Sequence, residues 1–177
     1  MRLCFTHRQR AVGGLPVLTA LALVAGALTC GPAHAAYSIT VPTTASLGSL
    51  RVGGGTLAGS LGTVTVSSDS AGGSWAVTVI STTCTTGSGR PYERISSGLL
   101  QYRSGAATAT TGPVSVVTPG QPAGANTVTL AGGRRAFSAT AARGAASSVS
   151  WSPTLTVTVP TNVVVGTYSC TIMHSVA

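Results

Sequence analysis

Lysine is absent from this 177-residue sequence, and the only acidic residues are Asp69 and Glu93. All ten cations are arginines, charged residues make up 7% of the chain, and the formal net charge is +8. Disordered chains combine low hydrophobicity with high charge, whereas 44% of this chain is hydrophobic. The length is that of one ordinary domain. We therefore expect a single folded domain with a mostly neutral, weakly basic surface.

Side chains that carry out acid–base chemistry are equally scarce. Beyond residue 35 the chain has one histidine, His174, and the two acids, which lie far apart in the sequence. It has no Gly-x-Ser-x-Gly motif, no Walker phosphate loop and no spaced set of zinc ligands. The sequence therefore favours a non-enzymatic protein without metal or cofactor. The enzyme alternatives are a Ser–His–acid site on His174 and a carboxylate pair of Asp69 and Glu93.

The first 35 residues are typical of a secretory signal peptide. Arginines at positions 2, 8 and 10 precede an apolar stretch over 11–29, and Ala33-His34-Ala35 is a small-x-small cleavage site. We expect cleavage after Ala35, with residues 1–35 outside the fold and residues 36–177 as the mature domain. Glycines and a proline interrupt the apolar stretch, which disfavours the alternative of a membrane anchor. Lipidation at Cys30 is a second alternative, disfavoured because Thr29 precedes it.

Removal of the leader changes the cysteine count and the charge. Of four cysteines, Cys84 and Cys170 remain, and seven arginines against two acids give a net charge of +5. Disulfides form and persist in the oxidising compartments that exported proteins enter. We expect a Cys84–Cys170 disulfide, and the alternative is a pair of buried thiols.

Alternating apolar and polar residues predict β-strands throughout the mature chain. The strongest run is 154–159, and the run 167–176 places Cys170 and His174 on one apolar face. Other strands are expected at 37–41, 61–66 and 74–80, with weaker ones at 49–52, 99–103, 114–117, 127–130 and 136–140. Segments 104–112 and 119–125 are predicted loops. Because no segment has an amphipathic helical period, we predict an all-β fold, an Ig-like or Greek-key β-sandwich of about ten short strands.

Arginines and tyrosines gather in one part of the sequence. Arg90-Pro91-Tyr92-Glu93-Arg94 is followed by Tyr102-Arg103. Guanidinium groups and aromatic faces bind anionic or sugar polymers, so Arg90, Tyr92, Arg94, Tyr102 and Arg103 are candidate polymer-binding residues. The alternative is an ordinary exposed hairpin. Nucleic acid is disfavoured as a partner because the remaining arginines are scattered along the chain and the protein is expected to be exported.

Two segments resemble WxL-type cell-surface domains. The first, Asp69 to Val79, contains Trp75 and Val77 in an Asp-(Gly-rich)-Trp-x-hydrophobic pattern. The second contains Trp151, a Pro-bounded strand and Gly166-Thr167-Tyr168, similar to the ending of those domains and of exported actinobacterial relatives. Where the family has its second Trp-x-Leu, this chain has Met173-His174-Ser175. The resemblance implies noncovalent attachment to the peptidoglycan of a Gram-positive envelope.

These patterns together predict an exported, non-enzymatic surface protein associated with the cell wall. Its expected partners are peptidoglycan or anionic wall polymers, or other surface proteins. A pilus-like or spore-coat-like subunit is the alternative, because a neighbour's strand can complete such a sandwich. A secreted inhibitor or small enzyme is the remaining hypothesis.

Overall fold

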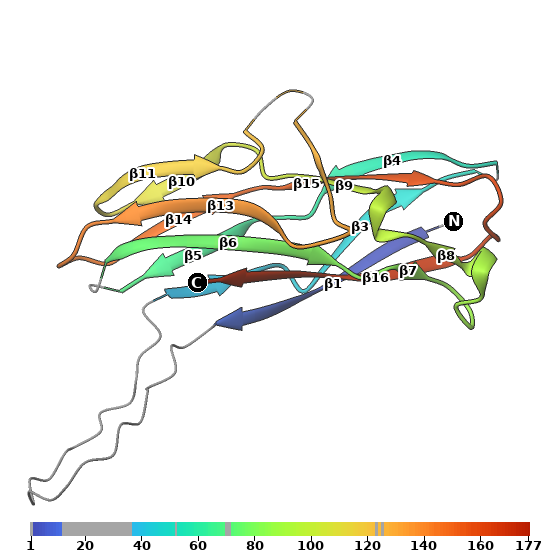
Figure 1. Ribbon diagram of the computed structural model, residues 1–177, viewed down its shortest axis with the longest axis horizontal. Helices are drawn as coiled ribbons and strands as arrows, with labels where there is room; N and C mark the ends of the chain where they lie inside the picture. Colours follow the sequence, from blue (N-terminus) through green and yellow to red (C-terminus); the bar gives the residue numbers. More distant parts are fainter. Residues whose placement is uncertain (1, 12–36, 52, 70–71, 123, 125) are drawn as a thin grey trace, which may run out of the picture.

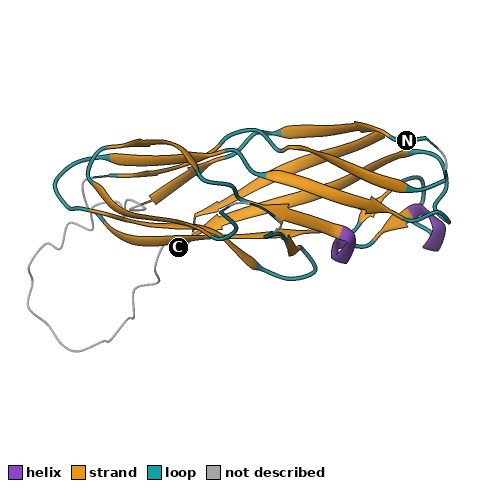
Figure 2. Ribbon diagram, turned by 90° about the horizontal axis from the view of Figure 1, so that it is seen from above, coloured by secondary structure: helices purple, strands orange, loops and turns teal. Residues whose placement is uncertain are grey.

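The protein is an elongated all-β molecule (Figures 1 and 2). The computed structural model describes residues 2–11, 37–51, 53–69, 72–122, 124 and 126–177. Within them are sixteen strands in three sheets and two single-turn 3-10 helices, η1 (Pro91–Glu93) and η2 (Ser97–Leu99). The predicted all-β class is confirmed.

The large sheet has eight strands and is curled and mixed. Its strand order is β11 (Val114–Pro119), β13 (Arg134–Ala141), β6 (Gly73–Ser81), β16 (Thr167–Val176), β1 (Arg2–Ala11) and β3 (Thr44–Ser49), with β7 (Cys84–Thr85) paired to β16 and β8 (Arg94–Ile95) to β7. The second sheet has the order β10 (Ala107–Thr111), β14 (Ser147–Trp151), β5 (Val64–Ser68) and β2 (Tyr37–Thr40). The third has the order β12 (Val128–Thr129), β9 (Leu100–Arg103), β15 (Thr154–Val159) and β4 (Gly55–Ser60).

Most strands with strict alternation lie where the sequence predicts them, although the strand expected at 61–66 is β5, which begins only at Val64. β15 and β16 have the predicted bounds, and their burial alternates with a period of two. The expected number of about ten strands was too low, because several strands are short or lack an apolar face. The predicted loop 104–112 contains β10, whose Ala and Thr side chains are mostly exposed and whose backbone pairs with β14. The strand expected at 49–52 is also wrong, since Ser49 ends β3 and the chain then leaves the sheet.

The segment expected to be a leader contributes one strand, β1, to the fold of the uncleaved chain. β1 pairs in parallel with β16 over ten residues and antiparallel with β3, and Leu3 is buried. In the uncleaved chain this stretch therefore belongs to the large sheet, and the assignment of residues 1–35 to a removable leader stays a prediction. An extended chain satisfies the backbone groups of two neighbouring strands whatever its biological fate. The predicted cleavage point lies outside the described residues, and cleavage stays a prediction.

The apolar faces of the three sheets meet in one core. Trp151 of β14 stacks on Phe137 of β13, with ring centroids 4.5 Å apart, which joins the second sheet to the large one. Trp75, Val77 and Tyr168 are also buried. The WxL-like motif residues are therefore core residues, and their role in this fold is packing.

The Cys84–Cys170 disulfide is present, as predicted. It joins β7 to β16 with Cα atoms 4.3 Å apart, and both cysteines are buried. Cys170 points inward because the alternation of β16 places it on the apolar face. The bridge therefore connects the short β7–β8 ribbon to the centre of the large sheet.

Candidate functional site

The sequence-predicted candidates do not form a single site. The structure divides them among the core, one end of the molecule and the outer face of the third sheet. A further feature, the position of β1 between β3 and β16, was not expected from the sequence.

Tyr102 lies in the core, which contradicts its assignment as a polymer-binding residue. Its side chain is 0% exposed. The hydroxyl lies 3.2 Å from Nε2 of His174 and accepts a hydrogen bond from Nε1–H of Trp151 at 3.4 Å. Tyr102, Trp151 and His174 come from β9, β14 and β16, so this buried hydroxyl links all three sheets. Leu100 and Tyr102 alternate with Gln101 and Arg103, and this alternation was the signal that could have placed Tyr102 inside.

Burial sets the protonation behaviour of the tyrosines. Loss of hydration raises the pKa of Tyr102 well above its ordinary value of 10, and the hydrogen bond from Trp151 acts in the opposite direction with a smaller effect. The pKa of Tyr168 is also raised, first by burial and then by the nearby Glu93 carboxylate. Both phenols are therefore neutral hydrogen-bonding groups under ordinary conditions.

Arg90, Tyr92 and Arg94 lie together at one end of the molecule, on and beside η1. The Glu93 carboxylate accepts a hydrogen bond from the Arg90 backbone N–H at 2.8 Å, and the Arg94 guanidinium donates to the Gly89 carbonyl. These bonds hold the turn in shape while leaving Tyr92 61% exposed. The predicted grouping of these three residues is therefore present, although Tyr102 does not belong to it.

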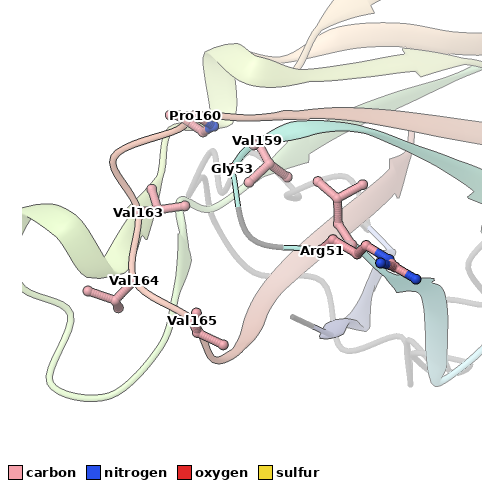
Figure 3. A pocket seen from close by; sticks show the side chains of 9 residues that line it. Arg51, Gly53, Val159, Pro160, Val163, Val164 and Val165 are labelled. Carbon is pink, nitrogen blue, oxygen red and sulfur yellow. The ribbon is translucent and has the colours of Figure 1, made fainter.

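The η1 turn is attached to the loop that precedes β16. The Val164 backbone N–H donates to the Tyr92 carbonyl at 2.9 Å, and the Tyr168 hydroxyl donates to the Val164 carbonyl at 2.9 Å. Figure 3 shows Val163, Val164 and Val165 on one side of a hollow and Arg51 on the other. This hollow has a volume of only about 20 Å³, little more than one water requires. It is too small for a metabolite or a sugar.

Arg103 lies elsewhere, in a larger polar hollow on the outer face of the third sheet. The hollow has a volume of about 430 Å³ and is lined by Ala58, Gly59, Ser60, Arg103, Gly124, Thr127, Thr154 and Thr156. Arg103 donates to the Thr154 hydroxyl from Nε and to the Gly124 carbonyl from Nη1, each at 3.3 Å. These bonds use two of the five guanidinium N–H donors.

The strand pattern explains why this lining is polar. In β15 the threonines 154, 156 and 158 alternate with buried Leu155, Val157 and Val159. Ser60, Thr154 and Arg103 are register partners across β4, β15 and β9, so their side chains form a row across the sheet. Sequence reasoning named Arg103 and missed its neighbours, although the three threonines on one strand face were a visible signal.

The titratable groups considered for catalysis are dispersed. His174 is 0% exposed and contacts Tyr102 in the core. Asp69 precedes β6, and Glu93 is part of η1; the start of β6 and η1 lie at opposite ends of the molecule (Figure 1). Among the described residues, no three His, Cys, Asp or Glu side chains gather as a metal site would require. In the same part of the chain, no helix is long and apolar enough to cross a membrane.

Comparisons with known proteins do not identify a family. No family model, no curated protein and no solved structure matches this chain.

Proposed function

We propose that this chain is an exported, non-enzymatic protein of the cell envelope that binds anionic wall polymers noncovalently through the Arg103 hollow. The observation that carries the proposal is the hollow itself, with one guanidinium among hydroxyl groups and glycines on the half-buried outer face of the third sheet. The WxL resemblance agrees with a wall location, and the disulfide is compatible with export. The Ig-like or Greek-key sandwich remains the proposed description of the fold.

The chemistry of the hollow suits phosphate or carboxylate groups on a polyhydroxylated chain. The guanidinium has donors beyond the two bonded to Thr154 and Gly124, and its planar fork pairs with both kinds of anion. Hydroxyls of threonine and serine donate to and accept from sugar hydroxyls. The volume of about 430 Å³ is within the range of ligand sites, and an open strand face accommodates a continuing polymer.

Retention on purified cell walls tests this proposal. Arg103→Gln is expected to weaken binding to walls that carry anionic polymer about tenfold, because hydrogen bonds to charged groups contribute about 1.5–3 kcal/mol. Arg143→Gln is the matched control, since Arg143 is exposed between β13 and β14 and the charge loss is the same. The double variant Arg90→Gln/Arg94→Gln tests the η1 end separately.

The outcomes separate a site from diffuse charge. Equal loss in the Arg103 and Arg143 variants would show that overall charge alone binds the wall, and the hollow would not be the site. Unchanged retention in every variant would contradict wall-polymer binding altogether. On walls stripped of anionic polymer, the Arg103→Gln and Arg143→Gln variants should be retained equally.

An assembly subunit is the second candidate function. The observation that favours it is the position of β1, which fills a place in the large sheet that the expected cleavage would vacate.

A further inference from the structure

β1 occupies a slot whose two walls are otherwise separate. All ten of its residues, Arg2–Ala11, pair in parallel with β16, and Arg2 to Thr6 also pair antiparallel with β3. β1 is the only strand with which β3 pairs among the described residues. On its other side, β16 pairs with β6 and β7. Within the described chain, β1 is therefore the only strand whose pairing joins β3 to the rest of the large sheet.

The expected cleavage after Ala35 would remove this strand. One edge of β16 would then lose its partner over ten residues, and β3 would lose its partner altogether. The walls would stand roughly 9.6 Å apart, twice the spacing of neighbouring strands. Leu3 is 0% exposed, so its departure would also uncover apolar surface. Unpaired strand edges beside exposed apolar surface readily accept another strand.

We propose that the slot between β3 and β16 is a strand-acceptor site, which in the mature protein takes an extended arm of a different exported polypeptide. The inference rests on removal of the leader and is independent of polymer binding at Arg103. The arm would run parallel to β16 and antiparallel to β3, as β1 does. The binding would consist of backbone hydrogen bonds along both walls, with an apolar side chain in the place of Leu3.

The geometry of the slot specifies the chemistry of this arm. Leu3 lies opposite Tyr168 on β16 and Gly48 on β3, and the pairing with β3 shifts register between Leu3 and Cys4. Leu3 pairs with Gly48 and Cys4 with Ser46, so the buried Leu47 between them has no register partner in β1. Such a bulge fixes the register, so the arm needs a leucine-sized residue at one defined position. Proline is excluded where the arm pairs on both sides, because its nitrogen has no hydrogen to donate.

A second copy of the mature chain is a poor donor. Strands β2 and β4 to β16 all have partners within the described fold that do not depend on β1. β3 would lose its pairing, but its buried residue Leu47 would still pack against Gly59 of β4. The contact is close, because a Cβ added at Gly59 would lie 2.9 Å from Leu47 Cδ2. A copy that donated a strand would have to extract one from its own fold. We therefore assign the arm to a different chain.

The test compares the secreted protein with the uncleaved full chain. The probe is a synthetic peptide of residues 2–11 with Cys4→Ser, which removes thiol chemistry. The secreted protein, with its N-terminus at residue 36 verified by intact mass, should bind this peptide with one-to-one stoichiometry and gain thermal stability. The same peptide with Leu3→Asp should bind at least tenfold more weakly. The uncleaved chain should not bind the probe, because its own β1 fills the slot.

A variant of the full chain and an exchange measurement complete the design. Leu3→Asp in the uncleaved chain should loosen β1 and make the slot available to the probe. In the secreted protein, hydrogen exchange at β16 amides should slow when the peptide is added. If the secreted protein is unfolded alone, the peptide should restore its folded circular dichroism spectrum.

Several outcomes would overturn the inference. One is a secreted protein that retains residues 2–11. Another is a secreted protein that ignores the peptide, whether because β3 pairs directly with β16 or because the chain stays unfolded. Spontaneous assembly of the secreted protein into oligomers with protected β16 amides would show that a second copy fills the slot, contrary to the assignment.

The Arg103→Gln variant distinguishes this site from the proposed polymer site. Loss of wall retention in this variant with unchanged peptide binding would show that the two sites are separate.

Discussion

The Tyr102 hydroxyl connects side chains from all three sheets, so loss of this one group should lower the stability of the core. Tyr102→Phe removes the group that accepts from Trp151 and contacts His174. We expect a loss of about 1–3 kcal/mol in the free energy of unfolding, the range for leaving buried polar groups without a partner. Denaturant unfolding measures it, with Tyr92→Phe as control because Tyr92 is 61% exposed. Equal effects of the two substitutions would refute the bridging role.

The raised pKa of Tyr102 predicts a loss of stability in alkaline solution. In the unfolded chain the phenol ionises near pH 10, whereas burial keeps it protonated in the folded protein to higher pH. The folded state therefore holds more protons above pH 10, and the free energy of unfolding should fall as pH rises through that region. Urea unfolding at several values between about pH 8 and 11 checks this. Tyr102→Phe should reduce the slope without abolishing it, because the pKa of Tyr168 is raised too.

At the scale of elements, close backbone approach determines which glycines can be replaced. A Cβ on Gly120, just beyond β11, would lie 2.2 Å from the Arg135 carbonyl oxygen, whereas one on Gly132 would have no neighbour within 4 Å. Gly120→Ala should lower the free energy of unfolding by about 1–3 kcal/mol through forced backbone movement. Gly132→Ala, the matched control, should change it by less than about 0.5 kcal/mol. Thermal unfolding of both variants distinguishes local crowding from a general glycine effect.

The disulfide also joins elements that are distant in sequence, because it connects β7 to β16 across 86 residues. Replacing both cysteines with alanine should cost up to about 4–5 kcal/mol, since the unfolded chain loses a long covalent loop. Denaturant midpoints of the double variant and the parent measure the cost. A change below about 1 kcal/mol would show that the bridge adds little to the packing around β7.

For the whole molecule, the net charge of +5 over residues 36–177 predicts salt-sensitive retention on anionic walls. Raising ionic strength from about 0.05 to 0.5 M shortens the screening length severalfold and should release most of the protein. Elution across a salt gradient measures the effect, with neutral polysaccharide as the control matrix. Retention that does not respond to salt would contradict an electrostatic contribution and point to apolar or neutral contacts instead.

The sequence by itself determined the features that depend on short-range patterns. Period-two alternation defines β15 and β16, since neighbouring residues of a strand face opposite sides. The same rule places Cys170 inside, and the small number of cysteines makes Cys84 its natural partner. Such features need no knowledge of which strand lies beside which. The compartment, ligand and partner predicted from the sequence remain predictions.

Only the tertiary structure decided how the candidate residues are distributed. Tyr102 and Arg103 are adjacent in sequence, yet one lies in the core and the other in a polar hollow whose remaining lining comes from β4, β15 and loop residues. β10 is a strand because β14 lies beside it, since its own exposed side chains provide no apolar face. The slot that β1 occupies lies between β3 and β16, which are separated in sequence by more than a hundred residues. Pairing between distant segments is absent from local patterns, so the sequence predicted the strands but not the slot.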